Sequence, residues 1–109
     1  MIEVNVRSSH ITVNGHARGA PYGKDIICAG VSTLAQNLIG SIKDLTEDEI
    51  QYEISPGWVD IKFKDLSERS KTLMDSFFIG IRMIANECPA NVQIVSKEFE
   101  KLSRHLRKK

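Results

Sequence analysis

Cysteine is scarce in this chain, which argues against a fold held together by disulfides. Its 109 residues include only two cysteines, Cys28 and Cys88, far apart and in different predicted helices. We therefore expect two reduced thiols in a reducing compartment. A chain of this length can bury one core without disulfide or metal support, so a single domain is expected.

Segments that would direct the chain to a membrane are also absent. Residues 1–4 (Met-Ile-Glu-Val) show no basic region followed by an apolar stretch, so no signal peptide is expected. No apolar run approaches the roughly 18 residues that span a bilayer. We therefore expect a cytoplasmic protein with no membrane partner.

The chain has no large excess of charge of one sign, since its 15 Lys and Arg residues nearly balance its 14 Asp and Glu residues and the net charge is +1. Residues 97–109 hold six Lys or Arg against Glu98 and Glu100, a local charge of +4, whereas residues 1–96 carry −3. We expect a domain over residues 1–96 and a basic C-terminal tail over residues 97–109. The body has no broad nucleic-acid surface. Only the tail would attract RNA, and a solvated terminus is the simpler interpretation.

Hydrophobic periodicity predicts five strands and two helices. Apolar residues alternate with polar ones over residues 2–6, 11–13, 50–54, 59–63 and 92–94, and recur at helical spacing over 27–45 and 67–85. The order β-β-α-β-β-α-β predicts an α+β two-layer sandwich, a largely antiparallel sheet with two helices on one side. Gly30 and Gly40 fall inside the first helix, where we expect them to allow close packing.

His16 and Cys28 stand on either side of a glycine-containing connector, residues 17–27. His16 follows the second predicted strand, and Cys28 is predicted in the first turn of the first helix. A cysteine nucleophile acts as the thiolate, which both a helix N-terminus and a nearby imidazolium favour. The connector can bring the imidazole over the thiol, since each extended residue spans about 3.3–3.6 Å.

Asp25 and Ser32 extend this group, because a helix places them on the same face as Cys28. Asp25 would orient His16, cap the helix or hold a basic group of a substrate. Ser32 would donate a hydrogen bond to the thiolate or to an oxyanion, or would only pack within the helix.

Two short segments together resemble the signature of the ribosomal-processing cysteine proteases, the Prp family. They are Gly-His-Ala at residues 15–17 and Gly-Lys-Asp-Ile-Ile-Cys-Ala-Gly-Val-Ser at residues 23–32. The family pattern is Gly-His-Ala, a loop, then Gly-x-Asp-Ile-[Val/Ile]-Cys-small-small-Val-Ser. The resemblance covers about residues 1–96, including the element order. Gly30 stands where the family more often has Ala, and the basic tail is longer than is usual there.

The resemblance implies a cytoplasmic, homodimeric cysteine endopeptidase that removes a short N-terminal extension from a large-subunit ribosomal protein, or acts on a phage protein. It implies Cys28 as the nucleophile and His16 as the general base. A loop over residues 17–24 would close over an extended peptide. The supporting or substrate-binding positions would be Gly15, Gly19, Gly23, Asp25 and Ser32.

Two other functions fit the same residues. A non-catalytic module would bind the ribosome or RNA through the scaffold and the basic tail, and that binding would survive loss of Cys28. In a redox sensor, Cys28 would be oxidised to a sulfenate or would form a disulfide with Cys88. No metal or cofactor is expected, because zinc needs three or four converging ligands and His16 with Cys28 supplies two. His10 and His105 are expected to be solvated.

Overall fold

Five strands and two helices follow one another in the predicted order. They are β1 (Ile2–Arg7), β2 (His10–Gly15), α1 (Gly23–Leu45), β3 (Ile50–Ser55), β4 (Trp58–Phe63), α2 (Glu68–Glu87) and β5 (Val92–Ile94). The computed structural model describes residues 1–15 and 23–95, with the side chains of residues 23–25 left out. The proposed tail, residues 97–109, lies outside the described residues.

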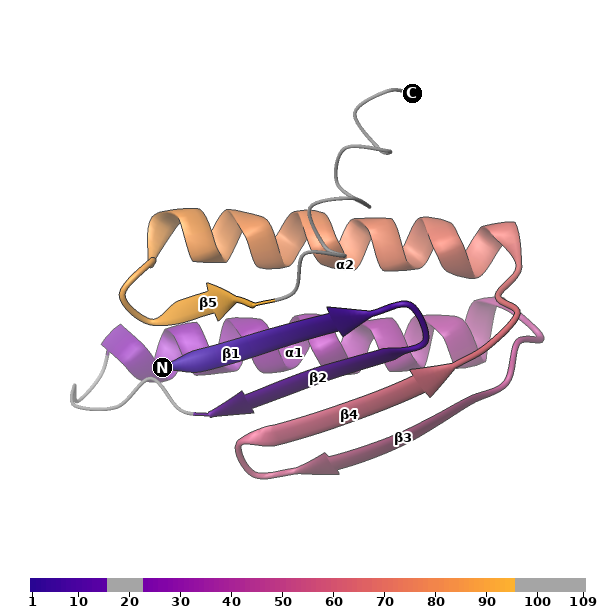
Figure 1. The fold of residues 1–109 in the computed structure, drawn as a ribbon, viewed down its shortest axis with the longest axis horizontal. Coiled ribbons are helices and arrows are strands. Elements are labelled where there is room, and N and C mark those ends of the chain that lie inside the picture. The colour runs from indigo at the N-terminus through magenta and orange to yellow at the C-terminus, as the bar shows by residue number, and fades with distance from the viewer. Residues whose placement is uncertain (16–22, 96–109) are drawn as a thin grey trace.

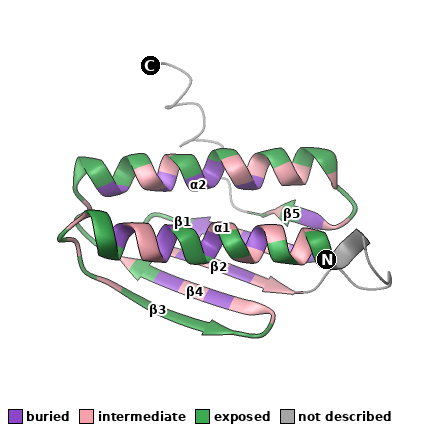
Figure 2. Ribbon diagram, turned by 180° about the vertical axis from the view of Figure 1, so that it is seen from behind, coloured by how far each residue is buried: buried purple, intermediate pink, exposed green. Residues whose placement is uncertain are grey.

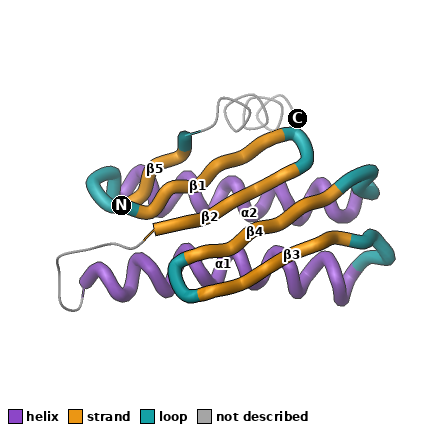
Figure 3. The backbone as a smooth tube through the Cα atoms, turned by 60° about the horizontal axis from the view of Figure 1, so that its bottom comes forward, coloured by secondary structure: helices purple, strands orange, loops and turns teal. Residues whose placement is uncertain are grey.

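The strands form one sheet in the order β3-β4-β2-β1-β5. Each neighbouring pair is antiparallel except β1 and β5, which run parallel. Both helices lie on the same face of the sheet. The sheet is in front of the helices in Figures 1 and 3, and the helices are in front of the sheet in Figure 2. The predicted α+β two-layer sandwich is therefore confirmed.

The alternation along the strands and the helical spacing along α1 and α2 decide which side chains enter the core. Fully burying one such apolar side chain stabilises a fold by about 1.5–3 kcal/mol. Leu45, expected on the buried face, is instead 53% exposed, because α1 ends at that residue. The buried set includes Val4, Val6, Ile11, Val13, Val59 and Ile61 from the sheet, Val31, Ala35, Leu38 and Ile42 from α1, and Met74, Phe77, Phe78 and Ile81 from α2.

Gly30 and Gly40 of α1 do not create the close approach between the helices. A Cβ added to Gly40 would meet nothing within 4 Å, and one added to Gly30 would lie 3.5 Å from Ile84 Cδ1, an ordinary contact. The prediction that both glycines allow close packing is therefore wrong. The close approach is at Gly80 of α2, where a Cβ would lie 2.9 Å from Leu34 Cδ1.

The composition of α1 corrects the expectation about apolar runs. By length and composition alone, its residues Ile26–Leu45 would suffice to cross a membrane. The core helix of a water-soluble fold passes the same test. In this fold one face of α1 packs against the sheet and α2, as the buried stripe in Figure 2 shows. That packing accounts for the buried apolar residues of α1, whereas Ile26 and Leu45 are exposed.

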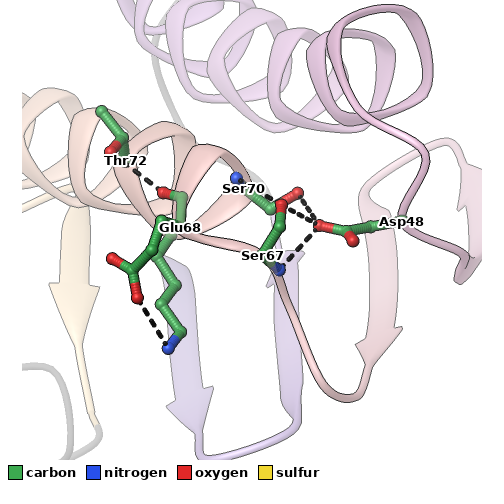
Figure 4. Close-up of polar contacts among 6 residues, drawn as sticks. Asp48, Ser67, Glu68, Ser70 and Thr72 are labelled. Carbon is green, nitrogen blue, oxygen red and sulfur yellow. Dashed lines mark hydrogen bonds and ion pairs between the residues drawn. The ribbon is translucent and has the colours of Figure 1, made fainter.

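Asp48, in the loop between α1 and β3, holds the start of α2 (Figure 4). Ser67 donates its hydroxyl and its backbone N–H to Asp48 Oδ2 at 2.6 and 2.9 Å, and Ser70 donates its hydroxyl to the same oxygen. Ser67 is also the N-cap of α2, since its side chain accepts from the Ser70 N–H. The hydroxyls of Ser67 and Ser70, followed by the Ser67 N–H, lower the pKa of Asp48.

Replacing Asp48 with Asn should reduce stability near neutral pH, because it removes the charge that these donors stabilise. An acid whose folded pKa is lowered contributes stability that is fully present above its unfolded pKa, about 3.9. That contribution is lost as the pH falls through the folded pKa. The difference in unfolding free energy between wild type and Asp48→Asn should therefore be constant from about pH 7 to about pH 5 and shrink below about pH 4. Urea denaturation across this range measures it, and a difference unchanged in strong acid would contradict the role of the charge.

Candidate active site

A cavity of about 270 Å³ lies at one end of the sandwich. At this end the start of α1, the end of β2 and the β3–β4 turn come together (Figure 1). Cys28 supplies a thiol to an otherwise largely apolar wall, and Ser32 and Ser55 supply hydroxyls. The remaining lining residues are Ile2, Val13, Gly15, Ala29, Val31, Gly57, Trp58 and Val59.

Cys28 is partly buried, contacts the core and lines this cavity. Its expected place in the first turn of α1 is wrong, because the helix begins at Gly23 and Cys28 therefore lies in the second turn. The N–H groups that have no acceptor within the helix are those of its first four residues, 23–26. Since the influence of the helix dipole falls off within the first turn, the helix end acts on Cys28 less than a first-turn position would allow.

Ser32 lies one turn after Cys28 and lines the same cavity. Its hydroxyl oxygen accepts a hydrogen bond from Gln36 Nε2 at 2.8 Å. Asp25 lies inside α1 and not at its N-cap, because the helix begins two residues earlier, at Gly23. An acidic residue in the first turn suits the positive end of the helix dipole. The structure thus joins Cys28 and Ser32 in one cavity, while the Asp25 side chain is outside the described part.

Gly15 ends β2 at the rim of the cavity with φ +106°. Its N–H donates to the carbonyl oxygen of Gly57, 3.0 Å away in the β3–β4 turn. A Cβ at position 15 would lie 2.2 Å from the Met1 carbonyl oxygen. Gly15 is therefore needed for a steric reason, and it fixes the backbone immediately before residue 16.

His16 and Gly19 lie outside the described residues, with most of the loop over residues 17–24. The pairing of His16 with Cys28 and the closing of that loop therefore stay predictions. Gly23, assigned to the loop from the sequence, is the first residue of α1.

The β3–β4 turn is the part of the cavity that sequence reasoning missed. Ser55, Gly57 and Trp58 line the wall together with residues of α1. Pro56 and Gly57 predict a turn, but nothing local indicates which cavity that turn borders. The pairing of β2 with β4, which places Asn14 opposite Trp58, carries the turn to the end of the sheet where Gly15 lies.

His10 is not simply solvated, as was expected. Its Nε2 lies 2.6 Å from Asp60 Oδ1, and both side chains are partly buried. Residue 10 is paired with Lys62 and residue 12 with Asp60, so the contact runs diagonally across β2 and β4. Neither partner lines the cavity, so this hydrogen bond is a sheet contact.

The redox hypothesis gains no support from the placement of the two thiols. Cys28 and Cys88 form no disulfide in the described structure. Within residues 1–15 and 23–95, no three His, Cys, Asp or Glu side chains come together as metal ligands.

Comparison with known proteins identifies the family. The model of the family described as cysteine protease Prp matches residues 1–93. The chain belongs to this family. It is a cysteine protease, and the sequence resemblance is confirmed.

Two relatives share the name ribosomal processing cysteine protease Prp. The protein from Mycoplasma genitalium is 25% identical over 103 residues, which cover 92% of this chain and 100% of the relative. The protein from Staphylococcus aureus strain Mu50 is 25% identical over 87 residues, covering 77% of this chain and 82% of the relative.

Solved structures show the same fold. The S. aureus protease Prp with a covalently linked product peptide superposes with a TM-score of 0.76 at 21% identity, over 88% of this chain and 97% of that one. The same protease with a substrate peptide also gives 0.76, at 20% identity and the same coverage. SMU.848 from Streptococcus mutans gives 0.67 at 27% identity, over 87% of this chain and 90% of that one.

Replacing Gly15 with Ala should destabilise the fold by about 1–3 kcal/mol, because the backbone is strained for any other residue and the new Cβ meets the Met1 carbonyl. Gly30→Ala is the matched control. It should stabilise the fold by up to about 1 kcal/mol, since Ala favours the helix and makes only an ordinary contact with Ile84. Urea denaturation measures both. A Gly15→Ala protein as stable as wild type would show that the close approach is not a constraint.

Proposed function

We propose that Cys28 is the nucleophile of this protease and His16 its general base. We propose as substrate the N-terminal extension of a large-subunit ribosomal protein. The observation that carries the proposal is that Cys28 supplies the one thiol of a cavity at an end of the sandwich. Membership of the cysteine protease family requires such a thiol. The relatives named for ribosomal processing support the class of substrate.

The reaction proceeds through an acyl-enzyme. His16 takes the proton of the Cys28 thiol, and the sulfur attacks the carbonyl carbon of the scissile peptide bond. The tetrahedral intermediate collapses to a thioester as His16 returns the proton to the leaving amine. Water, deprotonated by His16, then hydrolyses the thioester and releases the acid and the free thiol. The role of His16 rests on its place in the family motif at residues 15–17.

The described wall residues support this chemistry from two sides. Ser32 offers a hydroxyl one turn from Cys28, where negative charge develops on the thiolate. Ile2, Val13 and Val59 form the apolar, core-side wall. By limiting water there, these side chains strengthen the electrostatic interactions of the thiolate with its donors.

A cytoplasmic location and a homodimer belong to the same proposal, since both are implied by the family resemblance. Sedimentation equilibrium of the purified chain tests the dimer. A panel of extended N-terminal peptides, from ribosomal proteins and from phage proteins, separates the two substrate sources when the products are identified by mass.

Replacing Cys28 with Ala should lower cleavage of the preferred peptide by a factor on the order of 10⁴ or more, because the covalent route is removed. The matched control is Cys88→Ala, which removes the other thiol and should leave the rate within about twofold of wild type, since Cys88 lies at the end of α2 and takes no part in the reaction. Mass spectrometry of timed digests gives both rates. Cleavage that continues unchanged in Cys28→Ala would refute the assignment of the nucleophile.

A further inference from the structure

We propose that Gln36 is a positioning residue of this protease, acting through Ser32. The side-chain amide of Gln36 holds the Ser32 hydroxyl with its hydrogen directed toward the Cys28 sulfur. The three residues follow one another at four-residue steps on α1, so they stand on successive turns of one face. The inference rests on the proposed function, because it makes the Ser32 hydroxyl a hydrogen-bond donor to Cys28, the proposed nucleophile.

The direction of the hydrogen follows from which atom donates. A serine hydroxyl has one hydrogen and two acceptor lone pairs. Gln36 Nε2 donates to Ser32 Oγ at 2.8 Å and occupies one of those lone pairs. An amide NH₂ accepts no hydrogen bond, so the Ser32 hydrogen cannot be given to that nitrogen. The hydrogen must point away from Gln36, which lies one turn after Ser32. Cys28 lies one turn before Ser32, and both residues line the same cavity.

The helix backbone offers competing acceptors for the same hydrogen, the carbonyl oxygens three and four residues earlier. A serine within a helix can donate to the carbonyl oxygen four residues earlier, which here is that of Cys28. Such a bond would make Ser32 a purely structural residue. A donor directed at the sulfur would instead stabilise the thiolate, because hydrogen bonds to charged groups are the stronger ones. The two arrangements differ in whether Ser32 and Gln36 influence the reactivity of the thiol.

Gln36 suits a test because it is exposed and is not part of the cavity wall. In Gln36→Glu the donor becomes a carboxylate, which accepts the Ser32 hydrogen and draws it away from the sulfur. In Gln36→Ala the Ser32 hydroxyl loses the hydrogen bond from the Gln36 amide and can rotate among several orientations. Asn37→Asp is the matched control, since it places the same new charge on the next exposed position of α1, where Asn37 accepts from Ser41 at 3.3 Å.

The first measurement is alkylation of Cys28 by iodoacetamide at neutral pH, in a Cys88→Ala background that leaves one thiol. Gln36→Glu should slow alkylation about fivefold and Gln36→Ala about twofold, as expected when a donor to a thiolate is reversed or loosened. Asn37→Asp should leave the rate within about 1.5-fold, because its charge is exposed and screened. In a Ser32→Ala background, Gln36→Glu should have no further effect.

Peptide cleavage provides the second measurement. Gln36→Glu should lower kcat about fivefold with KM unchanged, because the interaction is made with the reacting sulfur and not with the bound peptide. The inference is overturned if alkylation is equally fast in Gln36→Glu and wild type, if Asn37→Asp slows it as much, or if the effect persists without Ser32. Because alkylation needs no peptide, it decides the role of Gln36 even if the proposed substrate is not cut. Failure of the proposed function appears separately, as cleavage that survives loss of Cys28.

Discussion

The packing of α1 across the sheet is the constraint on which the site depends. Val31, Ala35, Leu38 and Ile42 are buried along one face of this helix, and each large side chain among them contributes about 1.5–3 kcal/mol of apolar burial. These contacts fix the rotation of the helix about its axis. A shift of one residue would turn the helix by about 100° and expose the stripe. Cys28 comes to the cavity because it belongs to the same rigid helix, less than one turn before Val31.

The other walls of the cavity depend on close backbone contacts at the end of the sheet. Gly15, the last residue of β2, has a positive φ that residues with a side chain rarely adopt, and it lies beside the Met1 carbonyl. Its N–H donates a hydrogen bond to the carbonyl oxygen of Gly57 in the β3–β4 turn. Three segments far apart in the sequence thus meet at one point. The site is made from a helix, a strand end and a hairpin turn, and the proposed nucleophile, Cys28, lies on the helix. The hydrogen-bonded backbone of a helix suits a group that must be held in place for attack.

The second helix is coupled to the first through a polar contact at the opposite end of the sandwich from the cavity. Asp48 follows α1, and Ser67 and Ser70 begin α2, so their hydrogen bonds fix where α2 starts relative to the end of α1 (Figure 4). Along the helices, Gly80 then lets Leu34 approach closely. This arrangement keeps a polar cluster important for stability away from the thiol, so changes to one need not alter the other.

Local patterns in the sequence sufficed for the element order, the two-layer class, the beginning of the second helix near Ser67 and the family. Periodicity, capping and motif spacing all involve residues close in the chain. They also placed Cys28 and Ser32 on one face of a helix, since that follows from helical geometry alone. Only the tertiary structure decided four other features. They are the second-turn position of Cys28, the contribution of Ser55, Gly57 and Trp58 to the cavity, the hydrogen bond between His10 and Asp60, and the steric need for Gly15. Each depends on the pairing of β1, β2 and β4 or on where α1 begins. Contacts between distant segments are selected by the packing of the whole core, and no short stretch of sequence carries that information.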